Sequence, residues 1–276
     1  TAGVKEGDFT FIYGFPGSTQ EYIHSEGVRY ISEISDPHKV ALRTLRLEIF
    51  NKHMAASQDV RIKYSTKKAR VANAWKKWQG EAGGIRKMKT VATKQKFEED
   101  FSEWARGTAY EGLTDRIGDL CRELEGHQYL VDYYIETARC FEAASFAANI
   151  DRQCIPDRKD GPIDLTKLKK LSDEFFKDYY MPIDKECFAV LMDAFDRNIR
   201  PEYKPEYFKE KMARYGSADA WGEEMLSSTI YTDRTRMESV GETDREVLEN
   251  DPVKEFYVRM NGWIIPHTVK VQQINQ

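Results

Sequence analysis

The amino-acid sequence predicts a mainly helical fold with a single short strand near its start. From residue 36 onward, apolar residues recur every three or four positions, which is the period of an amphipathic helix. Only 9 prolines and 17 glycines interrupt the 276 residues, while aromatic residues make up 12% of them. This composition is typical of a folded protein with a sizeable core, and not of a disordered one.

The strand is expected over residues 7–14. Aromatic side chains at positions 9, 11 and 13 would share one face of it, and Gly14-Phe15-Pro16-Gly17 then has the composition of a turn. The only later segment with a comparable pattern is Thr268–Val271. Because a lone strand leaves its backbone hydrogen-bonding groups unpaired, we expect its sheet partners outside this chain.

The helices are predicted from their caps and apolar spacing. Asp36 and Pro37 suit the start of a helix that extends to about Ala56, and Ser57 suits the cap of a second helix that ends near residues 80–84. The segment 155–162, with two prolines and a glycine among charges, predicts an exposed loop. Further helices are expected over residues 93–106, 110–124, 128–149, 165–179, 182–198, 206–214, 217–228 and 252–260.

The net charge of −4 conceals a strong local asymmetry. Residues 61–96 hold twelve lysines and arginines and one acid, while residues 97–125 hold nine acids and three arginines. Trp75 and Trp78 within the basic stretch give it some character of a nucleic-acid surface. Both tryptophans lie on the apolar stripe of their predicted helix, so we favour a core role for them and a solvated or paired face for the cations.

No catalytic, cofactor or metal motif is evident. Ser18 lacks the Gly-x-Ser-x-Gly pattern of a nucleophile elbow, and Gly14-x-x-Gly17 lacks the lysine and hydroxyl residue of a phosphate loop. The four cysteines have no CxxC spacing and the five histidines are scattered, so neither a zinc site nor a redox pair is indicated. No run of about 18 apolar residues could cross a bilayer. Thr1–Gly7 has no signal-peptide pattern, and we expect the natural protein to begin upstream of Thr1.

Asn73 lies in the middle of the second predicted helix. At 100° per residue it is about 200° away from both Val71 and Trp75, so it projects from the face opposite the apolar stripe. On periodicity alone, Asn73 is an ordinary solvated residue.

Several stretches of the sequence resemble the bacterial dipeptidyl-peptidase 7 and dipeptidyl-peptidase 11 serine exopeptidases. Gly3–Tyr22 is similar to their barrel strand and turn, except that Ser18 stands where the family commonly has Arg. Ala69–Gly80 is similar to a motif of their helical domain, and Tyr215-Gly216-Ser217 and Asn250-Asp251-Pro252 fall where similar late motifs are expected. The resemblance covers essentially the whole chain.

The resemblance implies an architecture. Proteins of this family have a chymotrypsin-like double β-barrel that carries the Ser-His-Asp triad, and an inserted α-helical domain that caps the active-site cleft. The chain would then comprise a stub of the barrel at residues 1–35, a helical cap domain at residues 36–262 and a return segment toward the barrel at residues 263–276. It would contain no catalytic residue and would be inactive alone.

The resemblance also implies a substrate and a location. The substrate would be an oligopeptide with a free N-terminus, the rest of the parent chain would be the main partner, and a homodimer is left open. Nucleic acid, membrane insertion, metals and cofactors are not expected, and the location would be the periplasm or the cell surface. In the family, an asparagine of the motif matched by Ala72-Asn73-Ala74 helps to hold the substrate α-ammonium, which assigns Asn73 to substrate binding.

The alternative hypothesis is an independent helical module that uses its basic segment to bind nucleic acid or acidic partners. Binding of this kind would weaken steeply as salt rises, whereas a peptidase cap should bind nucleic acid negligibly.

Overall fold

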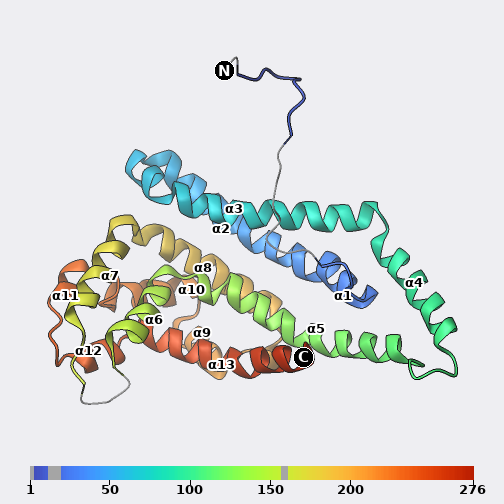
Figure 1. The fold of residues 1–276 in the computed structure, drawn as a ribbon. Helices are drawn as coiled ribbons and strands as arrows, with labels where there is room; N and C mark the ends of the chain where they lie inside the picture. The colour runs from blue at the N-terminus through green and yellow to red at the C-terminus, as the bar shows by residue number, and fades with distance from the viewer. Residues whose placement is uncertain (1–2, 12–19, 157–160) are drawn as a thin grey trace.

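Helices make up most of the computed structural model, which describes residues 3–11, 20–156 and 161–276 (Figure 1). Within these ranges there is no strand. The predicted strand is therefore wrong for residues 7–11, which are irregular and solvent-exposed, with Phe9 90% exposed. Without neighbouring strands in the described ranges, these residues have nothing to pair with. The rest of the predicted strand, its turn and Ser18 lie outside the described residues.

Thirteen α-helices follow one another in the described ranges, together with one π-helical turn at Ile31–Ser35 and 3₁₀ turns at Ala138–Cys140 and Pro201–Tyr203. The α-helices are α1 (Ser25–Tyr30), α2 (Asp36–Ala56), α3 (Gln58–Lys87), α4 (Thr90–Ala105), α5 (Leu113–Glu136), α6 (Glu142–Cys154), α7 (Leu165–Asp178), α8 (Met181–Asn198), α9 (Glu206–Tyr215), α10 (Ala218–Ser228), α11 (Arg234–Glu238), α12 (Arg245–Glu249) and α13 (Pro252–Ile274).

Three helix starts that the sequence predicts are confirmed by side-chain caps. Ser57 accepts a hydrogen bond from the Val60 amide at the start of α3, and Asp164 and Ser217 cap α7 and α10 in the same way. Each cap joins a side chain to an amide three residues later.

The predicted bounds of this helix are confirmed, since α2 is Asp36–Ala56, but the prediction that Asp36 caps a new helix is wrong. α1 passes through the π-helical turn into α2, so Asp36 lies inside one continuous helical path that begins at Ser25. Ser35, before it, has helical dihedral angles of −62° and −54° and makes no cap hydrogen bond. Pro37 cannot donate a backbone hydrogen bond, and the π turn directly before it accommodates the irregularity.

The helices predicted at 110–124 and 128–149 are divided differently in the structure. α5 continues through residues 125–127 to Glu136, and the break comes at residues 137–141. The buried carboxylate of Asp184, on α8, accepts hydrogen bonds from the amides of Glu142 and Ala143 at 2.8 and 2.9 Å. A distant residue therefore caps α6, and no local pattern could indicate that start.

The C-terminal segment is helical as well. α13 begins at Pro252, with Asp251 as its cap, and continues far beyond residue 260 across the predicted domain boundary at 262/263. Thr268–Val271 is thus helix and not strand. Met260 and Ile264, four residues apart, are buried on one face, and this burial favours a helix.

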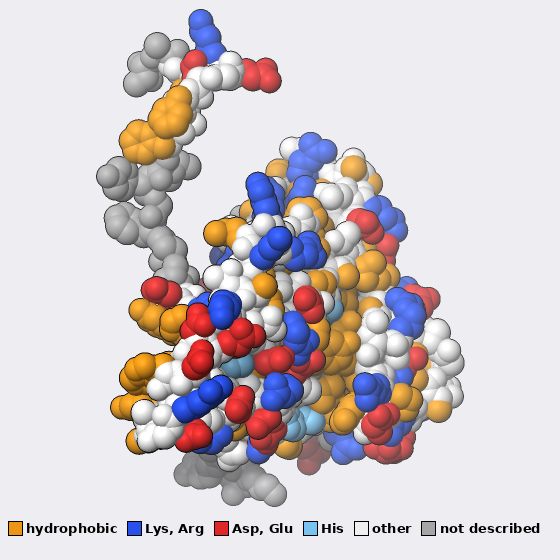
Figure 2. All heavy atoms as spheres, turned by 90° about the vertical axis from the view of Figure 1, so that its right-hand side faces the viewer, with side chains coloured by type: hydrophobic (Ala, Val, Ile, Leu, Met, Phe, Trp, Pro, Cys, Tyr) orange, Lys and Arg blue, Asp and Glu red, His pale blue; other side chains and the backbone are white. Residues whose placement is uncertain are grey.

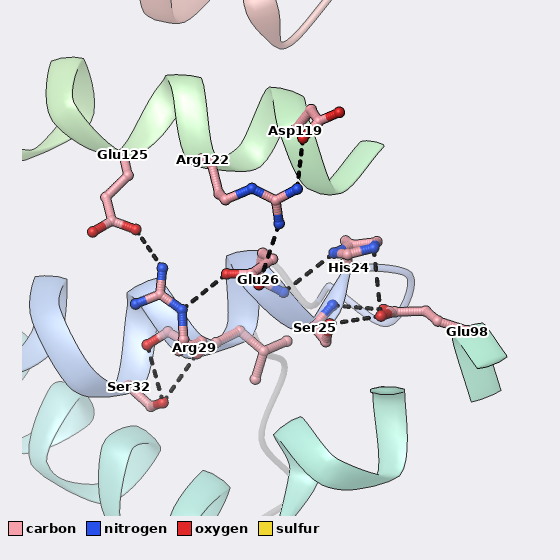
Figure 3. A network of polar contacts seen from close by, with 10 residues as sticks. His24, Ser25, Glu26, Arg29, Ser32, Glu98, Asp119, Arg122 and Glu125 are labelled. Atoms are coloured by element: carbon pink, nitrogen blue, oxygen red, sulfur yellow. Dashed lines mark hydrogen bonds and ion pairs between the residues drawn. The ribbon is translucent and has the colours of Figure 1, made fainter. Parts of the chain in front are cut away.

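α1 is fixed between α4 and α5 by charged hydrogen bonds (Figure 3). The amide and hydroxyl of Ser25 both donate to Glu98 of α4 at 2.6 Å. Arg29 donates to Glu26 at 2.9 Å and to Glu125 of α5 at 2.5 Å. Residues 25–35, predicted to belong to a barrel stub, are therefore helical and pack with the other helices.

A continuous apolar core lies among α2, α3, α5, α6, α8, α10 and α13. At its centre the rings of Phe188, Trp221 and Phe256 meet edge to face, with centroids 5.1 to 5.7 Å apart. Gly222 permits this approach, because a Cβ atom there would lie 2.7 Å from the Phe188 ring. The mainly helical fold class is confirmed.

Candidate functional site

The two faces of α3 have opposite characters. Val60, Tyr64 and Val71 on its inner face are buried, whereas Asn73 is exposed, as its spacing predicts. The Asn73 side chain has no hydrogen-bond partner within the described part of the chain. Its amide is therefore available to a ligand.

Both tryptophans of the basic segment pack toward α2. The Trp75 indole donates to the Thr44 hydroxyl at 2.9 Å, and Lys39 and Arg43 lie over the Trp78 ring at 4.7 and 4.4 Å. Trp75 packs against the core, as predicted, whereas Trp78 is half-buried beneath these two cations and is not part of the core.

Arg43 fixes α3 in position relative to α5. Its guanidinium donates two hydrogen bonds of 2.8 Å to the Glu136 carboxylate, which is a bidentate pair. It also donates to the carbonyl of Val71 at 3.1 Å, two residues before Asn73. This hydrogen bond fixes the backbone of α3 close to Asn73.

The surroundings of Asn73 are cationic. By helical spacing, Arg70, Lys76 and Lys77 lie one turn away on the same face. Lys77 pairs with Glu81 at 3.4 Å, but Arg70 and Lys76 have no acidic partner in the described ranges. All three cations are exposed and Lys77 is also paired, which agrees with the expectation of a solvated or paired face.

Three other cations of the basic segment pair with acids, while the rest of the segment's cations have no acidic partner in the described ranges. Lys63 pairs with Asp59, Lys67 with Glu142, and Lys96 with Asp100. This pairing lowers the charge that the segment could offer to a polyanion.

His24, Ser25 and Glu98 meet in Figure 3, but they do not form a catalytic triad. The carboxylate lies between the other two groups: the Ser25 hydroxyl donates to Glu98 at 2.6 Å, and His24 Nε2 is 3.4 Å from the same carboxylate. In a triad the histidine contacts the serine and removes its proton. Here the arrangement only anchors α1.

A buried polar cluster lies where α1 meets α2. Asp132 of α5 accepts hydrogen bonds from Ser35 at 2.6 Å and from Tyr30 at 3.2 Å. Burial raises the pKa of Asp36 to about 6 and lowers the pKa of His38 to about 4. No histidine activates the Ser35 hydroxyl, because both ring nitrogens of His38 lack a hydrogen-bond partner in the described residues. Sequence reasoning missed the cluster because its members come from separate helices.

The cysteines are unreactive and no metal centre is apparent. All four are free thiols, and burial raises the pKa of Cys140 and of Cys154 to about 11. Among the residues that the structure describes, no three His, Cys, Asp or Glu side chains are grouped to hold a metal ion. In the same residues no helix has the length and apolarity needed to cross a bilayer.

The sequence is related to dipeptidyl-peptidases. It is 31% identical over 212 residues to an Asp/Glu-specific dipeptidyl-peptidase of Capnocytophaga gingivalis, a match that covers 71% of this chain and 29% of the relative. It is 27% identical over 272 residues to dipeptidyl-peptidase 7 of Porphyromonas gingivalis, with 92% of this chain and 37% of the relative covered. The chain thus spans between 29% and 37% of the length of these relatives.

The fold is similar to part of a solved peptidase. The crystal structure of Porphyromonas endodontalis DPP11 in complex with the dipeptide Arg-Glu matches with a TM-score of 0.78 and 24% identity, over 95% of this chain and 39% of that one. The same protein in an alternate conformation matches with a TM-score of 0.60 and 18% identity, over 95% and 36%. The peptidase S46 family matches residues 1–273, which confirms the resemblance found in the sequence. This chain therefore belongs to the peptidase S46 family.

Proposed function

We propose that the chain is the helical cap domain of a serine dipeptidyl-peptidase, inserted in a double β-barrel, that releases dipeptides from free peptide N-termini. The family match over nearly the whole chain carries this proposal, together with the fact that the chain spans only about a third of its relatives. The triad would then lie on the remaining two thirds, and this chain alone would be inactive. The parent enzyme would act in the periplasm or at the cell surface.

Asn73 would bind the α-ammonium group of the substrate. A dipeptidyl-peptidase must recognise that ammonium, because its position fixes the distance of two residues to the scissile bond. The Asn73 side-chain carbonyl can accept a hydrogen bond from it without adding positive charge. Its exposure, its unpartnered amide and the Arg43 contacts that fix its backbone support this role.

The unpaired Arg70 and Lys76 near Asn73 oppose binding of a cation. The site therefore requires a compensating carboxylate from the remainder of the parent chain or from the peptide itself. The alternative of an independent nucleic-acid module is not favoured, since the chain belongs to a peptidase family.

The test is Asn73→Ala in the full-length parent enzyme. Loss of one hydrogen bond to a charged group costs roughly 1.5–3 kcal/mol, so kcat/KM should fall by about 10- to 150-fold. The melting temperature should be unchanged, because Asn73 makes no contact that stabilises the described fold.

Gln79→Ala is the matched control, since Gln79 is an exposed amide residue on the same helix. Its kcat/KM should equal that of the wild type. If the Asn73→Ala enzyme has an unchanged kcat/KM, or if its loss of kcat/KM is explained by unfolding, then Asn73 is only a solvated surface residue and the proposed role is wrong.

A further inference from the structure

A cavity of about 480 Å³ lies between the end of α5, the 3₁₀ turn after it, α6 and α13. Its polar lining consists of arginine, asparagine, serine and tyrosine residues, and the described residues that line it include no aspartate or glutamate. The polar side chains are Tyr134, Arg139, Ser145, Asn149, Arg152, Tyr257 and Asn261. None of them belongs to α3, so this cavity is separate from the Asn73 face.

The side-chain oxygens of the two asparagines in this cavity are already used as acceptors, and the Ser145 hydroxyl donates its proton to the Arg139 carbonyl at 3.0 Å. Arg152 donates to Oδ1 of Asn149 at 2.6 Å, and Tyr134 donates to Oδ1 of Asn261 at 3.2 Å. Because arginine has no acceptor atom, the contact fixes the orientation of the Asn149 amide. The NH₂ groups of both asparagines therefore remain as donors.

The two arginines are the charged groups of the cavity, and neither has a carboxylate partner in the described part of the chain. Both side chains are exposed to solvent. The neighbouring acids on these elements are engaged by other cations: Glu136 by Arg43, Glu142 by Lys67 and Asp151 by Lys254. The cavity is thus a concave, donor-rich surface with two uncompensated positive charges.

We infer that this cavity binds a small phosphate monoester. Arginine guanidinium groups match the geometry of phosphate oxygens and bind them with two parallel hydrogen bonds. A dianion would also relieve the repulsion between Arg139 and Arg152. The cavity is larger than a bare phosphate requires, and the half-buried Tyr257 ring can pack against an organic group.

The inference is independent of the proposed peptidase function, because it uses different helices and different chemistry. Its probes are inorganic phosphate and phenyl phosphate, titrated into the full-length parent enzyme by calorimetry at low salt. We expect saturable binding of both, with phenyl phosphate several-fold tighter, and weakening of both as salt rises.

Arg139→Gln and Arg152→Gln should each weaken phenyl phosphate binding by about 10-fold, and the double variant should abolish it. Arg200→Gln is the matched control, because Arg200 is exposed, lacks a carboxylate partner in the described ranges and lines a different cavity. It should bind as the wild type does. Exposed arginines can be replaced without loss of the fold, and melting temperatures verify this.

Three results would overturn the inference: no saturation up to about 10 mM phenyl phosphate, equal binding by the wild type and the double variant, or an equal loss in Arg200→Gln. Phosphate binding without any gain for phenyl phosphate would exclude the monoester as the ligand class.

Discussion

The aromatic centre of the core and the arm formed by α1, α4 and the first half of α5 are both helical, but different forces stabilise them. In the centre, Phe188, Trp221 and Phe256 are 2% exposed or less and contact one another. Full burial of one such side chain contributes about 1.5–3 kcal/mol, and this contribution depends little on salt or pH.

The arm has little apolar burial. Its buried residues Val28, Tyr30 and Ala105 are not part of the continuous core, and Phe97 and Trp104 of α4 are 70% and 64% exposed. Figure 2 views the molecule from the end where α4 lies, and acidic and basic side chains intermingle there. Within the arm, α1 is joined to α4 and α5 by the charged hydrogen bonds of Figure 3. We therefore expect it to open at lower free energy than the body does.

The largest effect should come from the aromatic centre. Phe256→Ala removes a ring that contacts Phe141, Phe188 and Trp221, and leaves a cavity that the surrounding helices cannot fill. We expect the free energy of unfolding to fall by about 3–5 kcal/mol in urea denaturation.

Trp104→Ala is the counterpart in the arm, because it also removes a large aromatic side chain. Trp104 is mostly exposed and packs on Phe101 and Tyr110 only at the surface. The loss should stay below about 1 kcal/mol. Equal losses for the two variants would show that the arm and the body share one core.

The elements that could be predicted from the sequence are those with local signals. The caps of Ser57, Asp164 and Ser217 act within three residues, so the starts of α3, α7 and α10 are found correctly. The break between α5 and α6 depends on Asp184, more than forty residues away, and α1 depends on Glu98 in the same way. Contacts between residues so far apart produce no periodic pattern in the sequence.

The same distinction between local signals and contacts of distant residues applies to the candidate sites. The exposure of Asn73 follows from its angle on one helix, while its role rests on the family resemblance. The cavity with Arg139 and Arg152 could not be predicted, because its lining comes from separate helices and contains no motif.

The junction of arm and body should respond to pH through Asp36. Burial raises the pKa of this carboxyl to about 6, and its Oδ2 atom has no hydrogen-bond partner in the described ranges. The folded state therefore holds the proton more tightly than the unfolded state does. The contribution of the Asp36 carboxyl to the free energy of unfolding is greatest below about pH 4 and is lost as the pH rises through 6.

Asp36→Asn removes this titration. Relative to the wild type, the variant should gain about 1–3 kcal/mol of unfolding free energy between pH 4 and pH 7. Asp219→Asn, at an exposed carboxylate, is the control and should show no such gain. The prediction would be contradicted if the free energy of unfolding changed with pH in the same way for the wild type and the Asp36→Asn variant over this range.

We expect Arg29→Gln to have the smallest effect on the global free energy of unfolding. It is also the sharpest test of the difference between the arm and the body. Arg29 joins α1 to Glu125 of α5, and the two side chains are 30% and 29% exposed, so the pair contributes at most about 1 kcal/mol. Because the arm has no continuous apolar core of its own, that loss should lower its local opening free energy rather than the global one. Hydrogen exchange should therefore become about five-fold faster in α1 and α4, with no change in α8 and α13, and the difference from the wild type should shrink in high salt. Arg116→Gln is the control, because among the described residues the Arg116 side chain donates only to the nearby Glu111 carbonyl, and it should leave exchange in α1 unchanged. Faster exchange in α8 and α13 as well would mean that the arm opens only when the whole molecule unfolds.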